Sequence, residues 1–205
     1  MSNIAIKGAA TGTGVFTLES PATNTNRTLV LPDEAGTLVT TASLPNPLTS
    51  GTAVASTSGT AIDFTGIPSW VKRITVMLNQ VSTNGSSNFI AQLGSGSVTT
   101  SGYKSYVSIT GASNVVTGSQ YTTGLGVDAG TGSASTTRTG LATFCLLTGS
   151  TWAQAFQMGF WNGSTAYTVQ GGGTIALSGT LDRIRLTTVN GTDTFDAGSI
   201  NIMYE

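Results

Sequence analysis

The chain has 205 residues and a net charge of −1, and only 8% of its residues are charged. Ordinary soluble domains have about 25% charged residues; here Ser, Thr, Gly and Asn take their place. A nearly neutral chain has no general attraction to nucleic acid or to anionic lipid, so neither is expected as a partner. The chain also contains no His, which excludes the commonest general base and metal ligand.

The predicted elements, taken in chain order, begin with four short strands near residues 4–7, 15–20, 27–31 and 37–41. The proline-containing segment 42–47 then breaks strand pairing and favours an extended connector. This N-terminal section is too small to form a core of its own. We therefore expect residues 1–45 to form an extended β arm, which buries its apolar residues against copies of itself.

Residues 46–205 show the period-two alternation of β-strands, with turn signals between the runs. They predict an antiparallel β-sandwich of the jelly-roll type, so the fold class expected for the whole chain is all-β. The apolar faces of the predicted strands are Trp70, Ile74, Val76 and Leu78; Trp152, Phe156, Met158 and Phe160; Ile184 and Leu186; Ile200, Ile202 and Tyr204.

Other positions in this region carry local predictions. Asn-Gly pairs at Asn84, Asn162 and Asn190 are interpreted as tight hairpin turns rather than as glycosylation sites. Residues 124–140 are expected to form a long loop, and Cys145 to be a small buried hydrophobe. The basic pairs Lys72-Arg73 and Arg183/Arg185 are expected to form salt bridges with Asp63 or Asp182.

No constellation in the sequence predicts an enzyme, a cofactor or a metal. A Ser-His-Asp triad needs His, and the acids are too scattered for the carboxylate pair of a glycoside hydrolase. The segment GAATGTG from Gly8 lacks the Lys-Ser/Thr of a phosphate loop and is interpreted as a turn. Asp182, Asp193 and Asp196 could surround calcium, but without calcium-loop spacing they are interpreted as solvated turn carboxylates.

The sequence contains no recognisable secretory signal and no apolar run of about 20 residues. We therefore expect synthesis in a cytoplasm and no insertion into a membrane.

Three segments resemble virion proteins of tailed bacteriophages. GVFTLESPATNTNRTLVLPDEAGTLVTTA, residues 14–42, resembles a motif that recurs in tail-fibre and other virion proteins. TAIDFTGIPSWVKRITVMLNQVSTNG, from Thr60, resembles the start of a β-rich C-terminal domain of phage structural proteins, and GSINIMYE is similar to its end. The resemblance implies a homotrimeric fibre subunit of the virion, with an N-terminal part that docks on the particle and a host-recognising tip.

Two other interpretations are kept. The chain has no long repeated shaft, which favours a short fibre, or alternatively a capsid decoration protein that clamps shell subunits. A carbohydrate-binding module is the third interpretation, because exposed aromatic rings stack on sugar faces. The aromatic residues outside the predicted core faces are Tyr103, Tyr106, Tyr121, Trp161 and Tyr167. They form a candidate rim for a host surface glycan, or else fill the core or the trimer interface.

Overall fold

The computed structural model describes residues 48–111, 116–130 and 132–205, and also positions 11–13, 17, 22, 24–26 and 28. The chain divides into two units, Met1–Thr40 and Thr41–Glu205, and the second is described below. The four short strands expected before residue 42, the phage-like segment 14–42 and the connector 42–47 lie outside the described residues, apart from the isolated positions. The N-terminal arm therefore remains a prediction.

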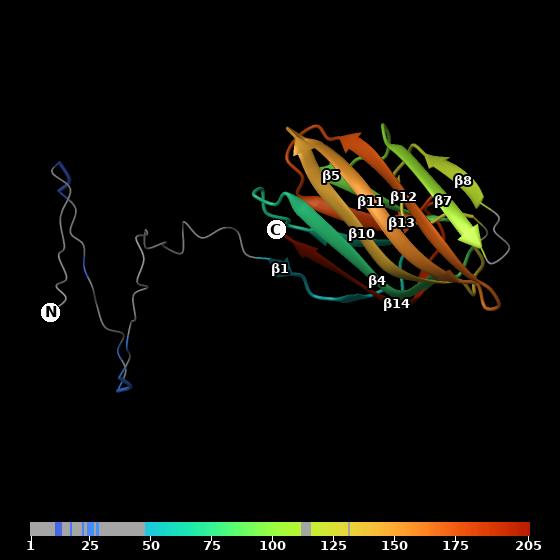
Figure 1. Ribbon diagram of the computed structural model, residues 1–205, viewed down its shortest axis with the longest axis horizontal. Helices are drawn as coiled ribbons and strands as arrows, with labels where there is room; N and C mark the ends of the chain where they lie inside the picture. Colours follow the sequence, from blue (N-terminus) through green and yellow to red (C-terminus); the bar gives the residue numbers. More distant parts are fainter. Residues whose placement is uncertain are drawn as a thin grey trace. The chain divides into compact units, whose positions relative to one another are not determined.

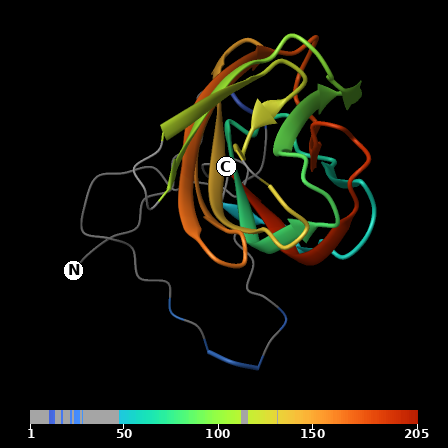
Figure 2. The ribbon, with the colours of Figure 1, turned by 90° about the vertical axis from the view of Figure 1, so that its right-hand side faces the viewer.

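The second unit is a β-sandwich of two antiparallel sheets (Figures 1 and 2). The larger sheet has nine strands in the order β1-β14-β4-β10-β11-β12-β7-β8, with β2 beside β14. The smaller has five, in the order β3-β13-β5-β6, with β9 beside β5. The prediction of an all-β sandwich is confirmed. A jelly roll, with eight strands in two Greek keys, is not confirmed.

The strands are β1 (Thr49–Ser50), β2 (Val54–Ala55), β3 (Ala61–Thr65), β4 (Arg73–Thr83), β5 (Phe89–Ser95), β6 (Ser97–Val98), β7 (Lys104–Gly111), β8 (Val116–Tyr121), β9 (Leu125–Gly126), β10 (Thr137–Thr148), β11 (Thr151–Trp161), β12 (Ala166–Ala176), β13 (Arg183–Thr188) and β14 (Phe195–Tyr204). In the described part of the chain, no helix is long and apolar enough to cross a membrane.

The core lies between the two sheets, and the predicted alternation identifies much of it. Each of four strands turns its expected apolar side chains inward, because successive residues of a strand point to opposite faces. The buried side chains are Ile74, Val76 and Leu78 of β4; Trp152, Phe156, Met158 and Phe160 of β11; Ile184 and Leu186 of β13; Ile200 and Ile202 of β14.

Strand β4 departs from the prediction at both ends. Trp70 lies in a turn before the strand and packs beside Tyr204, with ring centroids 5.9 Å apart. Gln80 has a φ of 51°, and the register with β10 shifts at this point. This β-bulge reverses the alternation, so Val81 rather than Gln80 faces the core.

One of the three Asn-Gly pairs lies in a hairpin, and the other two lie in connections between the two sheets. Asn162 lies in the short connection between the paired strands β11 and β12, as predicted. Asn84 and Asn190 instead lie where the chain leaves one sheet for the other, between β4 and β5 and between β13 and β14. The hairpin prediction is wrong for these two. A turn with positive φ, such as the 69° of Gly191, serves a corner between sheets as well as a hairpin.

Two further predictions are wrong. Residues 124–140 are not one loop, because β9 and the first residues of β10 lie within this range. Cys145 is exposed rather than buried. Strand β10 carries apolar residues on both faces, and only Ala142 and Phe144 on the inner face, with the half-buried Leu146, pack against the core. Cys145 alternates with them and therefore points outward.

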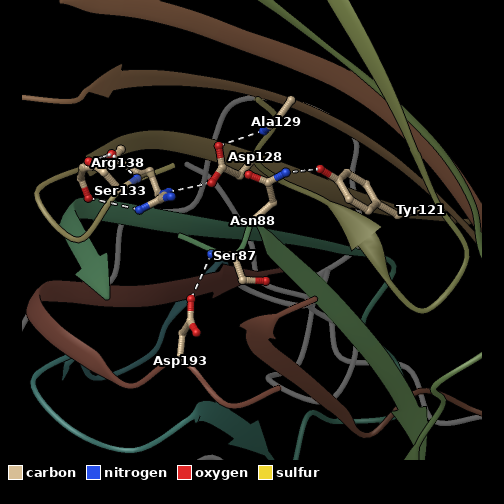
Figure 3. Close-up of polar contacts among 9 residues, drawn as sticks. Ser87, Asn88, Tyr121, Asp128, Ala129, Ser133, Arg138 and Asp193 are labelled. Atoms are coloured by element: carbon tan, nitrogen blue, oxygen red, sulfur yellow. Dashed lines mark hydrogen bonds and ion pairs between the residues drawn. The ribbon is translucent and has the colours of Figure 1, made fainter. Parts of the chain in front are cut away.

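A charged pair lies inside the sandwich (Figure 3). The Arg138 Nε donates to Asp128 Oδ2 at 2.7 Å, and both side chains are 1% exposed. The guanidinium also lies over the ring of Phe89, 4.0 Å from its centroid. Burial raises the pKa of Asp128, although the neighbouring Arg138 opposes the shift. The pair therefore fixes the loop before β10 against the core.

Tyr103 is buried in another part of the core, where its hydroxyl group forms hydrogen bonds with the backbone. The side chain is 2% exposed, and its Oη accepts a hydrogen bond from the Leu93 N–H at 2.8 Å. The same hydroxyl lies 2.9 Å from the Thr99 carbonyl oxygen, to which it can donate. Burial raises the pKa of Tyr103 to about 12, so the phenol stays protonated well above neutral pH.

We expect Tyr103→Phe to lower the free energy of unfolding by about 1–3 kcal/mol, because it leaves buried backbone groups without this partner. Urea denaturation of both proteins measures the difference. Tyr106→Phe is the matched control, since Tyr106 is 60% exposed and its hydroxyl is open to water. Equal losses in the two variants would contradict the role given to the Tyr103 hydroxyl.

Candidate functional site

The outer face of the larger sheet, turned away from the smaller sheet, is the most distinctive surface of the described residues. Strand register arranges its side chains in rows that cross the sheet. One row runs from Met77 through Leu141, Gln157 and Gln170 to Ser108. A second row runs through Thr75, Thr143, Ala155, Gly172 and Tyr106. Neither row contains a charged side chain.

The part of this face on β4, β10 and the start of β11 is rich in methyl and thioether groups. We call it the methyl-rich patch, which consists of Thr75, Met77, Leu141, Thr143, Cys145 and Ala153. Leu141 is 53% exposed, and Cys145 is exposed as well. Contiguous apolar surface of this kind commonly marks a contact with another molecule.

The part of this face on β11, β12 and β7 combines aromatic and amide side chains. We call it the aromatic-amide face, which consists of Tyr106, Ser108, Gln157, Gly159, Trp161 and Gln170. Gln157 pairs with Gln170 in register, and Gln170 pairs with Ser108. The side chains of Gln157 and Gln170 are exposed.

The structure separates the five aromatic residues of the predicted rim. Tyr106 and Trp161 are 60% and 47% exposed, and both lie on the aromatic-amide face. Tyr103 and Tyr121 are buried, at 2% and 8% exposure, so the prediction that they line an exposed rim is wrong. Both occupy the sandwich core, which was the alternative interpretation. Tyr167 is half-buried and packs edge-on against Phe160, with centroids 5.7 Å apart.

Each of the two exposed aromatic side chains borders a shallow depression. Trp161 lines one of about 520 Å³, together with Gly159 and Thr139. Tyr106 lines another of about 440 Å³, together with Ser108 and Gln170. Flat aromatic rings beside small residues make broad, shallow contact surfaces, unlike the deep and enclosed pockets that bind small molecules.

Two ion pairs lie on the smaller sheet or beside it, whereas Arg73 and Lys104 lie on the outer face, where Arg73 pairs in register with Cys145 and Lys104 with Thr174. Arg185 pairs with Asp63 at 2.7 Å, and Arg183 pairs with Asp182 at 2.8 Å, so the prediction of salt bridges to Asp63 and Asp182 is confirmed for these two. Arg73 pairs instead with Glu205, near one end of the outer face. Lys104 begins β7, two residues before Tyr106.

The three aspartates considered for calcium have separate partners. Asp182 binds Arg183 and accepts from the Gly96 N–H, and these contacts, the one with Arg183 above all, lower its pKa. Asp193 accepts from the Ser87 N–H at 2.8 Å (Figure 3), and Asp196 accepts from the Ser82 hydroxyl. Within the described residues, no group of three His, Cys, Asp or Glu side chains could hold a metal ion.

Sequence reasoning missed Gln157, Gln170 and Leu141 as members of the outer face. Gln157 alternates with the core residues Phe156 and Met158, so its outward direction could be predicted. Its neighbour Gln170 could not, because strand order is needed to bring β12 beside β11. The partners across the sheet therefore come from the structure alone.

The described residues form an all-β sandwich, and the outer face of its larger sheet presents two rows of uncharged side chains. Comparisons with protein families, with curated proteins and with solved structures found no match for the chain.

Proposed function

We propose that the chain is a structural subunit of a tailed-bacteriophage virion, a homotrimeric short tail fibre or surface fibre that attaches the particle to its host. The methyl-rich patch carries this proposal. Leu141 stands 53% exposed beside Met77 and Thr143, and copies of the chain would remove this patch from water. The resemblance of residues 14–42 and of the segment from Thr60 to phage virion proteins supports the particle as the place of assembly.

We expect the full-length protein to sediment as a trimer at micromolar concentration and to resist dissociation on dilution. Burial of apolar surface between copies is the physical reason, and the low charge of the chain puts little repulsion between them. Analytical ultracentrifugation measures the mass. A monomer at micromolar concentration would count strongly against the proposed assembly.

A capsid decoration protein is the second candidate, because contact with shell subunits would also remove the methyl-rich patch from water. Such a protein acts by clamping shell subunits and needs no host ligand. A reconstruction of the intact particle separates the two candidates. Density for the sandwich at the tail vertex supports a fibre, whereas density spread over the icosahedral shell supports decoration.

A further inference from the structure

The aromatic-amide face joins the two depressions of the outer face into one surface. Trp161 and Gly159 lie two residues apart on β11, and Tyr106 lies two strands away on β7. Trp161 pairs with Ala166 and Tyr106 pairs with Gly172, so the two positions are offset by six residues along β12. At about 3.4 Å per residue along a strand and about 4.8 Å between strands, the two aromatic residues are roughly 23 Å apart. A ligand that touches both must be long and extended.

The groups between the two aromatic side chains are uncharged hydrogen-bonding groups. Gln157, Gln170 and Ser108 form one row across the sheet, and Thr168 pairs with Gly159 in the next. Within the described part of the chain, the side-chain amides of Gln157 and Gln170 make no hydrogen bond. Each amide offers both a donor and an acceptor to a ligand.

We propose that the aromatic-amide face binds an extended, uncharged polysaccharide. The C–H faces of sugar rings stack on exposed aromatic rings, and their hydroxyl groups both donate to and accept from amides and hydroxyls. The inference rests on the host-attachment part of the proposed function and gives it a ligand class and a site. Lys104 is an exposed cation two residues before Tyr106, and it lies on the far side of Tyr106 from the row of amides.

Gly159 provides a test that does not depend on removing an aromatic side chain. A Cβ atom added there would be 3.6 Å from the nearest atom, the Thr139 carbonyl oxygen, so the strand has room for a side chain. Thr suits an exposed strand better than Gly does. Gly159→Thr is therefore expected to keep or raise the melting temperature while it fills the depression beside Trp161.

The experiment is binding of the full-length protein to an array of neutral and acidic bacterial oligosaccharides and polysaccharides. We expect binding to neutral members. Tyr106→Ala, Trp161→Ala and Gly159→Thr should each weaken it about tenfold, which corresponds to about 1.4 kcal/mol. Leu147→Ala is the control, since Leu147 is 68% exposed on β10 and lies outside the aromatic-amide face; its binding should equal that of the unaltered protein.

Three results would overturn the inference. The first is binding to no neutral glycan. The second is binding to acidic glycans only, lost in high salt and in Lys104→Gln. The third is dissociation of the oligomer by Tyr106→Ala or Trp161→Ala, which would show that another copy covers this face. Sedimentation of the same samples tests the assembly separately. A trimer that binds no glycan contradicts only this inference. A monomer that binds glycan contradicts only the proposed assembly.

Discussion

Arg138→Met is expected to lower the free energy of unfolding by about 3–5 kcal/mol at neutral pH, because it leaves the Asp128 carboxylate buried without its counter-ion. Arg138 and Asp128 are each 1% exposed and lie 2.7 Å apart. The substitution also removes a cation from above the Phe89 ring, where the guanidinium carbon lies 4.0 Å from the centroid. Denaturant unfolding of the two proteins measures the loss.

The exposed ion pair of Arg185 and Asp63 supplies a matched control in the same domain. Its side chains are 36% and 41% exposed, and its N–O distance is also 2.7 Å. Arg185→Met should cost less than about 1 kcal/mol, because solvent screens exposed ion pairs. Similar losses in Arg138→Met and Arg185→Met would show that burial does not set the importance of the pair.

A double variant separates the charge from the packing. Arg138→Met combined with Asp128→Asn removes both charges. In the unaltered protein the Ala129 N–H donates to Asp128 Oδ1 at 2.7 Å, and the side-chain oxygen of Asn can accept the same hydrogen bond. We expect the double variant to be more stable than Arg138→Met alone, since no uncompensated charge remains buried. A double variant less stable than Arg138→Met would place the loss in packing instead.

The pH dependence of Arg138→Met follows from the same carboxylate. Burial already raises the pKa of Asp128 in the folded chain, and loss of the opposing Arg138 raises it further. In the folded state a proton is therefore bound at pH values where the unfolded chain, with an Asp pKa of about 3.9, has lost it. Relative to the unaltered protein, Arg138→Met should recover stability as the pH falls through the folded pKa.

The sequence predicted the inner face of the sandwich well and its polar interior poorly. Ile184, Leu186 and the apolar side chains of β11 follow strict alternation, which depends only on local strand geometry. Asp128 and Arg138 lie ten positions apart in a Gly-, Ser- and Thr-rich stretch that indicates a surface loop. Only the three-dimensional fold brings them together over Phe89.

Strand β10 shows the other limit of prediction. In LATFCLL both faces of the strand are apolar, so alternation cannot tell which face is buried. Tyr103, Tyr106 and Tyr121 have the same difficulty, since all three occur in polar, Gly-bearing sequence yet only Tyr106 is exposed. Neighbouring strands decide which face is buried, and the pairing of these strands joins residues that lie far apart in the sequence.

The second large effect is expected from Leu141→Arg, which should convert the proposed trimer to a monomer. Leu141 lies between Met77 and Gln157 in register and is 53% exposed in the single chain. An exposed substitution of this kind changes the stability of the isolated sandwich by about 0.5 kcal/mol or less. In an interface between copies, the same cation would be buried without a partner, at a cost of about 2 kcal/mol or more for each contact. A loss of about 2 kcal/mol corresponds to about 30-fold weaker association.

Leu147→Arg is the control for this effect. It changes the same residue type on the same strand, and Leu147 is 68% exposed but lies within the β-bulge between Leu146 and Thr148, outside the methyl-rich patch. Sedimentation of both variants should give a monomer for Leu141→Arg and a trimer for Leu147→Arg. Two trimers would place the contact elsewhere on the chain.

Cys145 reports on the same contact without any substitution, because it is the single cysteine of the chain and belongs to the methyl-rich patch. In the isolated sandwich its thiol is exposed, so a water-soluble thiol reagent should label it quickly. Burial between copies should slow labelling in the assembled protein, and Leu141→Arg should restore the fast rate. Fast labelling of a trimer that Leu141→Arg leaves intact would show that the copies meet through other surfaces, and that the methyl-rich patch stays open to solvent.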